Sequence, residues 1–158
     1  MSAAPSFRVL GPVRVEAADG PVLLPPQETL VVAALLAARG LDVERDTLCD
    51  LLYGRPDPAG PEGALAAQVY ALGESLRDRG LPWLVRRTPF RWRLEVPAGS
   101  VDADRLGDWA DAAVAFESTG HVDGSTLEAL ARNESWLLDR PLDGLVHPWF
   151  VPFRDALA

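Results

Sequence analysis

The apolar residues of this chain recur with two spacings, and the most regular run lies between Pro61 and Arg79. Its large apolar side chains follow one another at intervals of four, three and four residues, which is the spacing of one face of an α-helix. The residues of this apolar face are Leu65, Val69, Leu72 and Leu76. The opposite face carries Ala67, Tyr70, Ala71, Glu74, Arg77 and Asp78. We therefore predict a helix over residues 61–79, and what its outward face contacts should decide the function.

Alternating and continuous apolar runs precede this helix. Phe7 to Glu16 alternates apolar and polar residues around a Gly-Pro break, which favours two strands, and Asp19-Gly20 signals a hairpin turn before a return strand at residues 21–24. Glu28 to Arg39 is apolar nearly all round, as expected of a buried helix. Arg45 to Tyr53 predicts a short second helix.

Two further strands are predicted after the helix at residues 61–79, at residues 83–87 and 91–96. In the second strand Trp92 and Leu94 alternate with Arg91 and Arg93, so one face should belong to the core while the other is solvated and basic. These two strands would form a β-hairpin.

The chain changes character after the Pro- and Gly-containing linker at residues 97–100. Asp102 is the expected N-cap of a helix that runs to about Glu117, and a second helix from Ser125 to about Leu138 would complete a helical hairpin. The tail from Pro141 holds several aromatic residues with few polar ones: Trp149, Phe150 and Phe153. Such side chains need a covering surface, so we expect either further chain after Ala158 or a partner chain to supply it.

Charge is unevenly distributed over the 158 residues, whose net charge is −8. Residues 1–96 carry a net charge of −1 and residues 97–158 carry −7, and every basic side chain is arginine. Globally this is not the basic profile of a nucleic-acid binder, so any such site must be local. One cluster qualifies, with six arginines and a single acid between residues 77 and 93.

The order of elements resembles the antibiotic regulatory proteins of the SARP type, in which an OmpR-like winged helix precedes a helical bacterial transcriptional activator domain. The resemblance rests on Phe7 to Val13, Ala33 to Gly40, Asp46, Leu48 to Gly54, Trp92 to Val96, Val101 to Ala103, Trp136 and Pro141 to Leu145. It implies an α+β fold: a winged helix-turn-helix with an N-terminal β-sheet and a C-terminal wing, followed by a partial TPR-like helical hairpin. The domains would be residues 1–98 and 99–158, the latter only the first part of the activator domain.

The resemblance also implies that the helix at residues 61–79 enters a DNA major groove while the wing approaches the minor groove. The sequence departs from the family here, because Tyr70, Ala71, Gly73 and Glu74 stand where its recognition helix has arginines. Base reading would then be weak. The candidate DNA-binding residues are Gln68, Tyr70, Arg77, Arg79, Arg86, Arg87, Arg91 and Arg93.

A different function remains open at this point. The small residues Ala67, Ala71 and Gly73 beside Tyr70 would allow another protein to approach closely, so a degenerate winged helix could serve as a protein-interaction module. Its candidate interface residues are Tyr70, Trp149, Phe150 and Phe153. The partners to consider are double-stranded DNA, RNA polymerase or another regulatory protein, and a second copy of the chain.

Catalysis, cofactor binding and metal binding find little support. Cys49 lies among leucines and is expected to be a buried structural thiol, and His121 and His147 are far apart with no nucleophile motif. We expect no enzyme activity, cofactor or metal. No apolar run is long enough to span a membrane, and a single cysteine with no signal-peptide pattern favours the cytoplasm.

Overall fold

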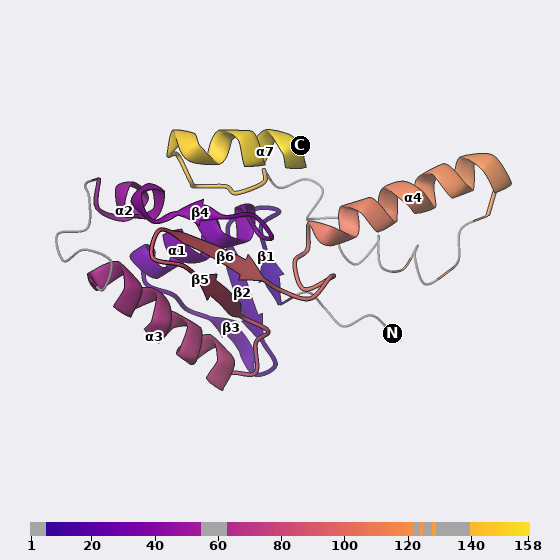
Figure 1. Ribbon diagram of the computed structural model, residues 1–158. Helices are drawn as coiled ribbons and strands as arrows, with labels where there is room; N and C mark the ends of the chain where they lie inside the picture. Colours follow the sequence, from indigo (N-terminus) through magenta and orange to yellow (C-terminus); the bar gives the residue numbers. More distant parts are fainter. Residues whose placement is uncertain (1–5, 55–62, 122–123, 125–127, 129–139) are drawn as a thin grey trace.

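The computed structural model describes residues 6–54, 63–121, 124, 128 and 140–158 (Figure 1). The chain opens with an antiparallel three-stranded sheet, in the order β1 (Phe7–Arg8), β2 (Arg14–Ala17) and β3 (Gly20–Val22). Phe7 pairs with Val15, and Val15 in turn pairs with Val22, so these three apolar side chains share the face that packs on the core. The predicted strand, turn and return strand are thus present.

Three helices follow, as predicted. α1 (Pro26–Ala37) buries every residue from Val31 to Leu36, which explains why its sequence shows no polar face. α2 (Arg45–Tyr53) and α3 (Ala64–Asp78) both contact α1. Cys49 is fully buried in α2, as expected of a structural thiol.

The wing is the antiparallel hairpin of β5 (Leu84–Arg87) and β6 (Arg91–Glu95), and the short strand β4 (Val43–Glu44) pairs with β6 to make a second three-stranded sheet, ordered β4-β6-β5. Trp92 and Leu94 are buried, whereas the alternate residues of β6 are exposed or half-buried. The alternation read from the sequence is therefore confirmed, and α1 contacts β6 from the core side.

Residues from the later part of the chain complete the core of the earlier part. Val101 forms a parallel bridge with Phe7, and the Leu142 N–H donates to the Val9 carbonyl at 2.8 Å. Among the residues that the structure describes after position 98, the buried apolar ones are Val101, Ala103, Leu142 and Phe150. The domain boundary between residues 98 and 99 stays a prediction, but the segments beside it share one hydrophobic core.

Asp102 is a buried polar residue in the seam where residues 101–103 meet residues 7–10. Its Oδ1 accepts from the N–H groups of Val9 at 2.9 Å and Ala103 at 2.8 Å, and its Oδ2 accepts from Leu10 N–H at 3.2 Å. The prediction that Asp102 caps a helix is wrong, because the N-cap is Ala103 and the fully buried carboxylate binds backbone N–H groups of Ala103 and of Val9 and Leu10 just after β1.

The helix that follows is α4 (Asp104–Thr119), with Ala103 at its N-cap and no side-chain cap. It extends away from the body of the molecule, and none of its residues is buried (Figure 1). At its start, Asp104 binds Arg39 at 2.6 Å, which ties α4 to the end of α1. The second helix of the predicted hairpin, Ser125 to Leu138, lies almost entirely outside the described residues.

The chain ends with a 3₁₀ turn η2 (Pro148–Phe150) and α7 (Val151–Leu157). This segment folds back beside α2, where His147 Nε2 lies 3.6 Å from Asp50 Oδ2. Arg154 fixes the return by donating to the carbonyls of Pro141 and Leu145, at 3.2 and 2.5 Å. No helix among the described residues is long and apolar enough to cross a bilayer.

Candidate nucleic-acid interface

The outward face of α3 is exposed, as its spacing predicts. All four residues of the apolar stripe are buried, while Tyr70 on the opposite side is 68% exposed. Gly73 was expected on this outward face but is buried, because it lies over the indole of Trp83. The lack of a side chain at Gly73 thus makes room for the Trp83 indole. The small-residue face of α3 is therefore reduced to Ala67 and Ala71.

Two of the candidate reading residues on α3 already have partners. The Gln68 Oε1 accepts from the Tyr53 hydroxyl at 3.1 Å, which ties a half-buried amide to α2. Arg77 forms an ion pair with Glu74 one turn earlier on the same helix. Of the candidate reading residues on α3, Tyr70 is therefore the one without a side-chain partner among the described residues.

The register of the wing separates its four arginines into two groups. Arg86 pairs with Arg93, whereas Arg87 pairs with the buried Trp92. Because paired residues in an antiparallel sheet project to the same face, Arg86 and Arg93 share the outer face with Arg91, while Arg87 projects toward α3. The prediction treated the four as one exposed set; the placement of Arg87 on the other face corrects it.

Among the described residues, the outer-face arginines are paired with Glu95 and Asp42, not with acids of the later helical part. Arg86 Nε lies 2.7 Å from Glu95 Oε2. This hydrogen bond raises the pKa of Arg86, and the negative charge of Glu95 adds to the effect. Asp42 serves two arginines, with Arg93 Nε at 2.9 Å and Arg91 Nη1 at 4.0 Å. These are exposed pairs, which contribute little to stability and exchange readily for another anion.

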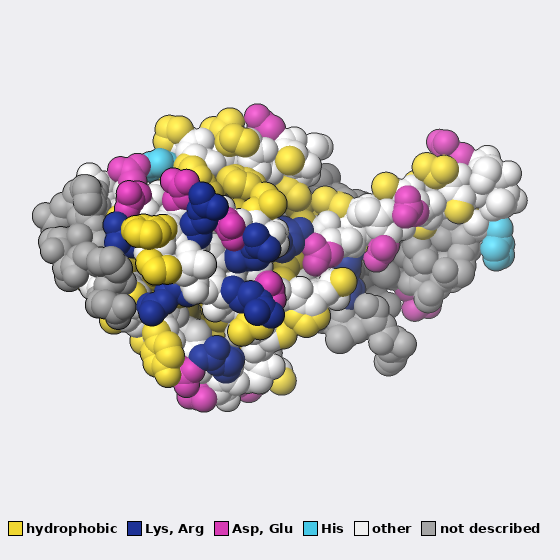
Figure 2. Space-filling view, viewed as in Figure 1, with side chains coloured by type: hydrophobic (Ala, Val, Ile, Leu, Met, Phe, Trp, Pro, Cys, Tyr) yellow, Lys and Arg dark blue, Asp and Glu magenta, His cyan; other side chains and the backbone are white. Residues whose placement is uncertain are grey.

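The remaining two arginines differ from the rest. Among the described residues, neither Arg79 nor Arg87 has an ion-pair or side-chain hydrogen-bond partner, and both are exposed. Six arginines between residues 77 and 93 thus lie among five carboxylates, a net charge of +1. The carboxylates are Asp42, Glu44, Glu74, Asp78 and Glu95, of which Glu44 pairs with Arg91 across the sheet. Figure 2 shows blue basic side chains gathered over the wing, with acidic ones between them, while the projecting α4 carries acids.

The aromatic tail, predicted as a protein interface, is largely covered by the chain itself. Phe150 is fully buried in the core, so its prediction as an interface residue is wrong. Trp149 packs edge-on against Phe150 with ring centroids 5.2 Å apart, and Phe153 packs on Trp149 at 4.7 Å. Both are half-buried. The sequence showed that these rings need a cover, but not that the earlier strands supply it.

Two residues of this surface were missed from the sequence. Asp42 limits the charge of the wing, yet it lies 51 residues before Arg93 and no local pattern links them. Phe90 at the tip of the wing is 67% exposed. Its position in the turn Thr88-Pro89-Phe90 could have revealed it, because a large apolar residue at a hairpin tip has no core to face.

Comparisons with known proteins give one informative likeness. No protein-family profile matches the chain, and no curated protein does. Among solved structures, the fold is similar to Mycobacterium tuberculosis EmbR in complex with a low-affinity phosphopeptide, with 25% sequence identity and a TM-score of 0.69. The likeness covers 96% of this chain and 41% of the EmbR chain, so this chain spans about two-fifths of that protein. Because EmbR is a regulator of the SARP family, the likeness supports a SARP-type winged-helix regulator.

Proposed function

We propose that this chain is a transcriptional regulator of the SARP type that binds double-stranded DNA, with α3 at the major groove and the arginine-rich wing at the phosphates or minor groove. The observation that carries the proposal is the pair of exposed arginines, Arg79 and Arg87, that have no ion-pair partner among the described residues. They lie on a surface of local net charge +1, in a chain whose total charge is −8. A basic patch on an otherwise acidic protein is the electrostatic footprint of nucleic-acid binding.

The arginines would divide the work according to their pairing. Arg79 and Arg87 can meet phosphates without losing a partner. Arg86, Arg91 and Arg93 can do so only by releasing Glu95 and Asp42, which reduces what each contact gains. Most of the affinity should therefore come from a few phosphate contacts and depend on salt.

Sequence reading should be weak. Tyr70 offers a hydroxyl, and Arg77 offers a guanidinium that Glu74 partly neutralises. Ala67 and Ala71 have no donor or acceptor for a base edge. We expect this protein to discriminate little between DNA sequences on its own and to gain specificity from a second copy or from a protein partner such as RNA polymerase.

The finer assignments belong to the same proposal. Residues 1–98 would be an OmpR-like winged helix, and residues 99–158 would begin a helical activator domain with a TPR-like hairpin. A regulator of this kind acts in the cytoplasm. The likeness to EmbR supports the regulator class, and the exposed basic wing supports the DNA contact.

A titration of labelled duplex DNA tests the proposal, with binding followed by fluorescence anisotropy at 50 and 200 mM salt. One phosphate contact from each of Arg79 and Arg87 predicts that the association constant for DNA falls about twelvefold between 50 and 200 mM salt. Loss of all binding at 50 mM salt would overturn the proposal and leave a protein-interaction module. An affinity that does not respond to salt would exclude the phosphate contacts.

A further inference from the structure

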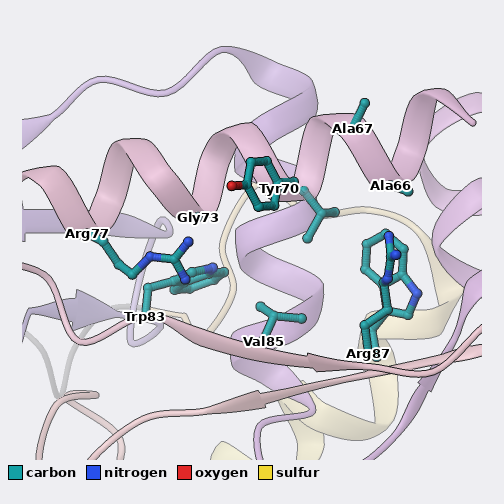
Figure 3. A pocket seen from close by; sticks show the side chains of 10 residues that line it. Ala66, Ala67, Tyr70, Gly73, Arg77, Trp83, Val85 and Arg87 are labelled. Atoms are coloured by element: carbon teal, nitrogen blue, oxygen red, sulfur yellow. The ribbon is translucent and has the colours of Figure 1, made fainter. Parts of the chain in front are cut away.

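A cleft of about 470 Å³ separates α3 from the wing, and its volume is that of a small-molecule site. Its walls are largely apolar and aromatic, and its rim is cationic. The side chains that matter most are Trp83 and Val85 on the wing side, Tyr70 and Gly73 on α3, and Arg77 and Arg87 at the rim. Figure 3 shows these side chains facing one another across the space between the helix and the strands.

The cleft contains a polar group without a partner. Trp83 is 2% exposed, and its indole Nε1 has no hydrogen-bond partner among the described residues. A buried N–H without an acceptor costs about 1–3 kcal/mol. The ring itself is held firmly, with its centroid 5.6 Å from that of Phe7. The indole N–H is therefore a fixed donor in the wall of the cleft.

Gly73 places no side chain over the edge of this indole. A Cβ at Gly73 would stand 3.5 Å from Cδ1 and 3.8 Å from Nε1 of Trp83, in ordinary contact with the indole edge. It would also stand 3.9 Å from Nη2 of Arg77, so the indole nitrogen and this guanidinium approach the same point. Any larger residue at this position would fill the space beside the donor.

The charge at the rim favours an anion. Arg87 projects from β5 on the face shared with Trp92 and has no ion-pair partner among the described residues. Arg77 forms an ion pair with Glu74, which neutralises part of its charge. The Tyr70 hydroxyl points toward the Gly73 and Arg77 end of the cleft (Figure 3). The indole N–H and Arg77 thus lie at one end of the cleft and Arg87 lies at the other, with Val85 between them (Figure 3).

We propose that this cleft binds a small organic anion, with a flat apolar body between α3 and the wing and an acidic group that reaches the Trp83 indole N–H and Arg77. A phosphodiester is a poorer occupant, because it gains nothing from apolar walls while it loses its hydration. A ligand placed here would use Arg77 and Tyr70, so it would compete with DNA for them. That competition rests on the proposed function; the binding itself does not.

The test uses the full chain and 2-naphthoate as the probe, followed by the indole N–H signals of the five tryptophans in a ¹H–¹⁵N spectrum. The Trp83→Phe variant identifies the signal of Trp83. We expect that signal to shift downfield and saturate as the probe forms its hydrogen bond. 2-Naphthylmethanol, which is neutral, should bind at least about tenfold more weakly, as a charged hydrogen bond is worth roughly 1.5–3 kcal/mol.

Two variants and a control locate the site. Gly73→Ala should weaken the probe about fivefold, the equivalent of one hydrogen bond, without loss of folding. Arg77→Gln should weaken it about tenfold or more. Arg14→Gln, an exposed arginine on β2 away from the cleft, should leave it unchanged.

The inference is overturned if the Trp83 signal does not move, if the neutral analogue binds equally well, or if Gly73→Ala and Arg77→Gln bind as the native chain does. Inorganic phosphate that shifts the same signal with equal affinity would also overturn it, in favour of a plain phosphate site. Because DNA is absent from this titration, its outcome is independent of whether the chain binds DNA.

Discussion

The substitution Asp102→Asn tests how the segment around residue 102 is joined to residues 9 and 10. The carboxylate of Asp102 is fully buried and accepts three backbone N–H groups from two segments that lie about 90 residues apart. Asparagine keeps nearly the same shape but replaces one acceptor oxygen with a donor. The variant therefore changes hydrogen bonding while the packing stays the same.

The size of the effect follows from which oxygen is lost. The retained oxygen can still accept from Val9 and Ala103, the two shorter bonds at 2.9 and 2.8 Å. The new NH₂ group then faces the N–H of Leu10, where Oδ2 stood at 3.2 Å. One buried donor loses its acceptor, which costs about 1–3 kcal/mol in the free energy of unfolding.

The dependence on pH has a definite sign. Burial raises the pKa of Asp102 from its ordinary 3.8, against the opposing effect of the three N–H bonds and of the Arg8 charge. The native state then binds the proton more tightly than the unfolded state. The stability contributed by protonation is fully present below about pH 3.8 and is lost as the pH rises through the raised value. Asparagine does not titrate. The difference in unfolding free energy between the native chain and the variant should therefore narrow as the pH rises through this window.

Urea unfolding followed by tryptophan fluorescence measures this difference at several pH values. The exposed Asp111 of α4 supplies the control, and Asp111→Asn should change stability by less than about 0.5 kcal/mol. If Asp102→Asn unfolds within that margin of the native chain at pH 7, the seam is not held by this carboxylate. A difference that widens with rising pH would refute the reasoning about its protonation.

Three further outcomes are expected. Gly73→Ala should stabilise the chain by about 0.5–1 kcal/mol in thermal unfolding, because a methyl group there makes ordinary contact with Trp83 and removes a helix glycine; a loss of stability would show that the space is needed for folding. Phe150→Ala should cost about 3–5 kcal/mol in urea unfolding, since the ring is fully buried, whereas a near-neutral result would mean that the tail does not pack on the core. Arg86→Gln should weaken DNA binding less than Arg79→Gln in anisotropy titrations, because Glu95 already neutralises Arg86; the reverse order would contradict the assigned pairing.

Local periodicity explains what the sequence could predict. The stripe from Leu65 to Leu76 and the alternation of Trp92 and Leu94 each depend on neighbours within a turn or a strand, and both are present in the structure. The two faces of the wing were also within reach. Arg86 and Arg87 are adjacent, so a strand must send them to opposite sides.

Contacts between distant segments explain what could not be predicted. Asp102 resembles an N-cap locally, and only the fold brings Val9 and Leu10 to it. Phe150 was correctly taken as a ring that needs covering, but its cover lies in the earlier part of the chain. The neutralising role of Asp42 likewise depends on the pairing of β4 with β6.

The salt dependence of DNA binding tests the central claim most directly, when the native chain is compared with the double variant Arg79→Gln/Arg87→Gln. One phosphate contact from each of the unpaired Arg79 and Arg87 predicts a slope of log K against log salt of about −1.8 for the native chain. Removing the two unpaired arginines should bring the slope close to zero and abolish most of the binding at low salt. A native chain with no affinity for DNA at low salt, or a double variant with the native slope, would contradict the account.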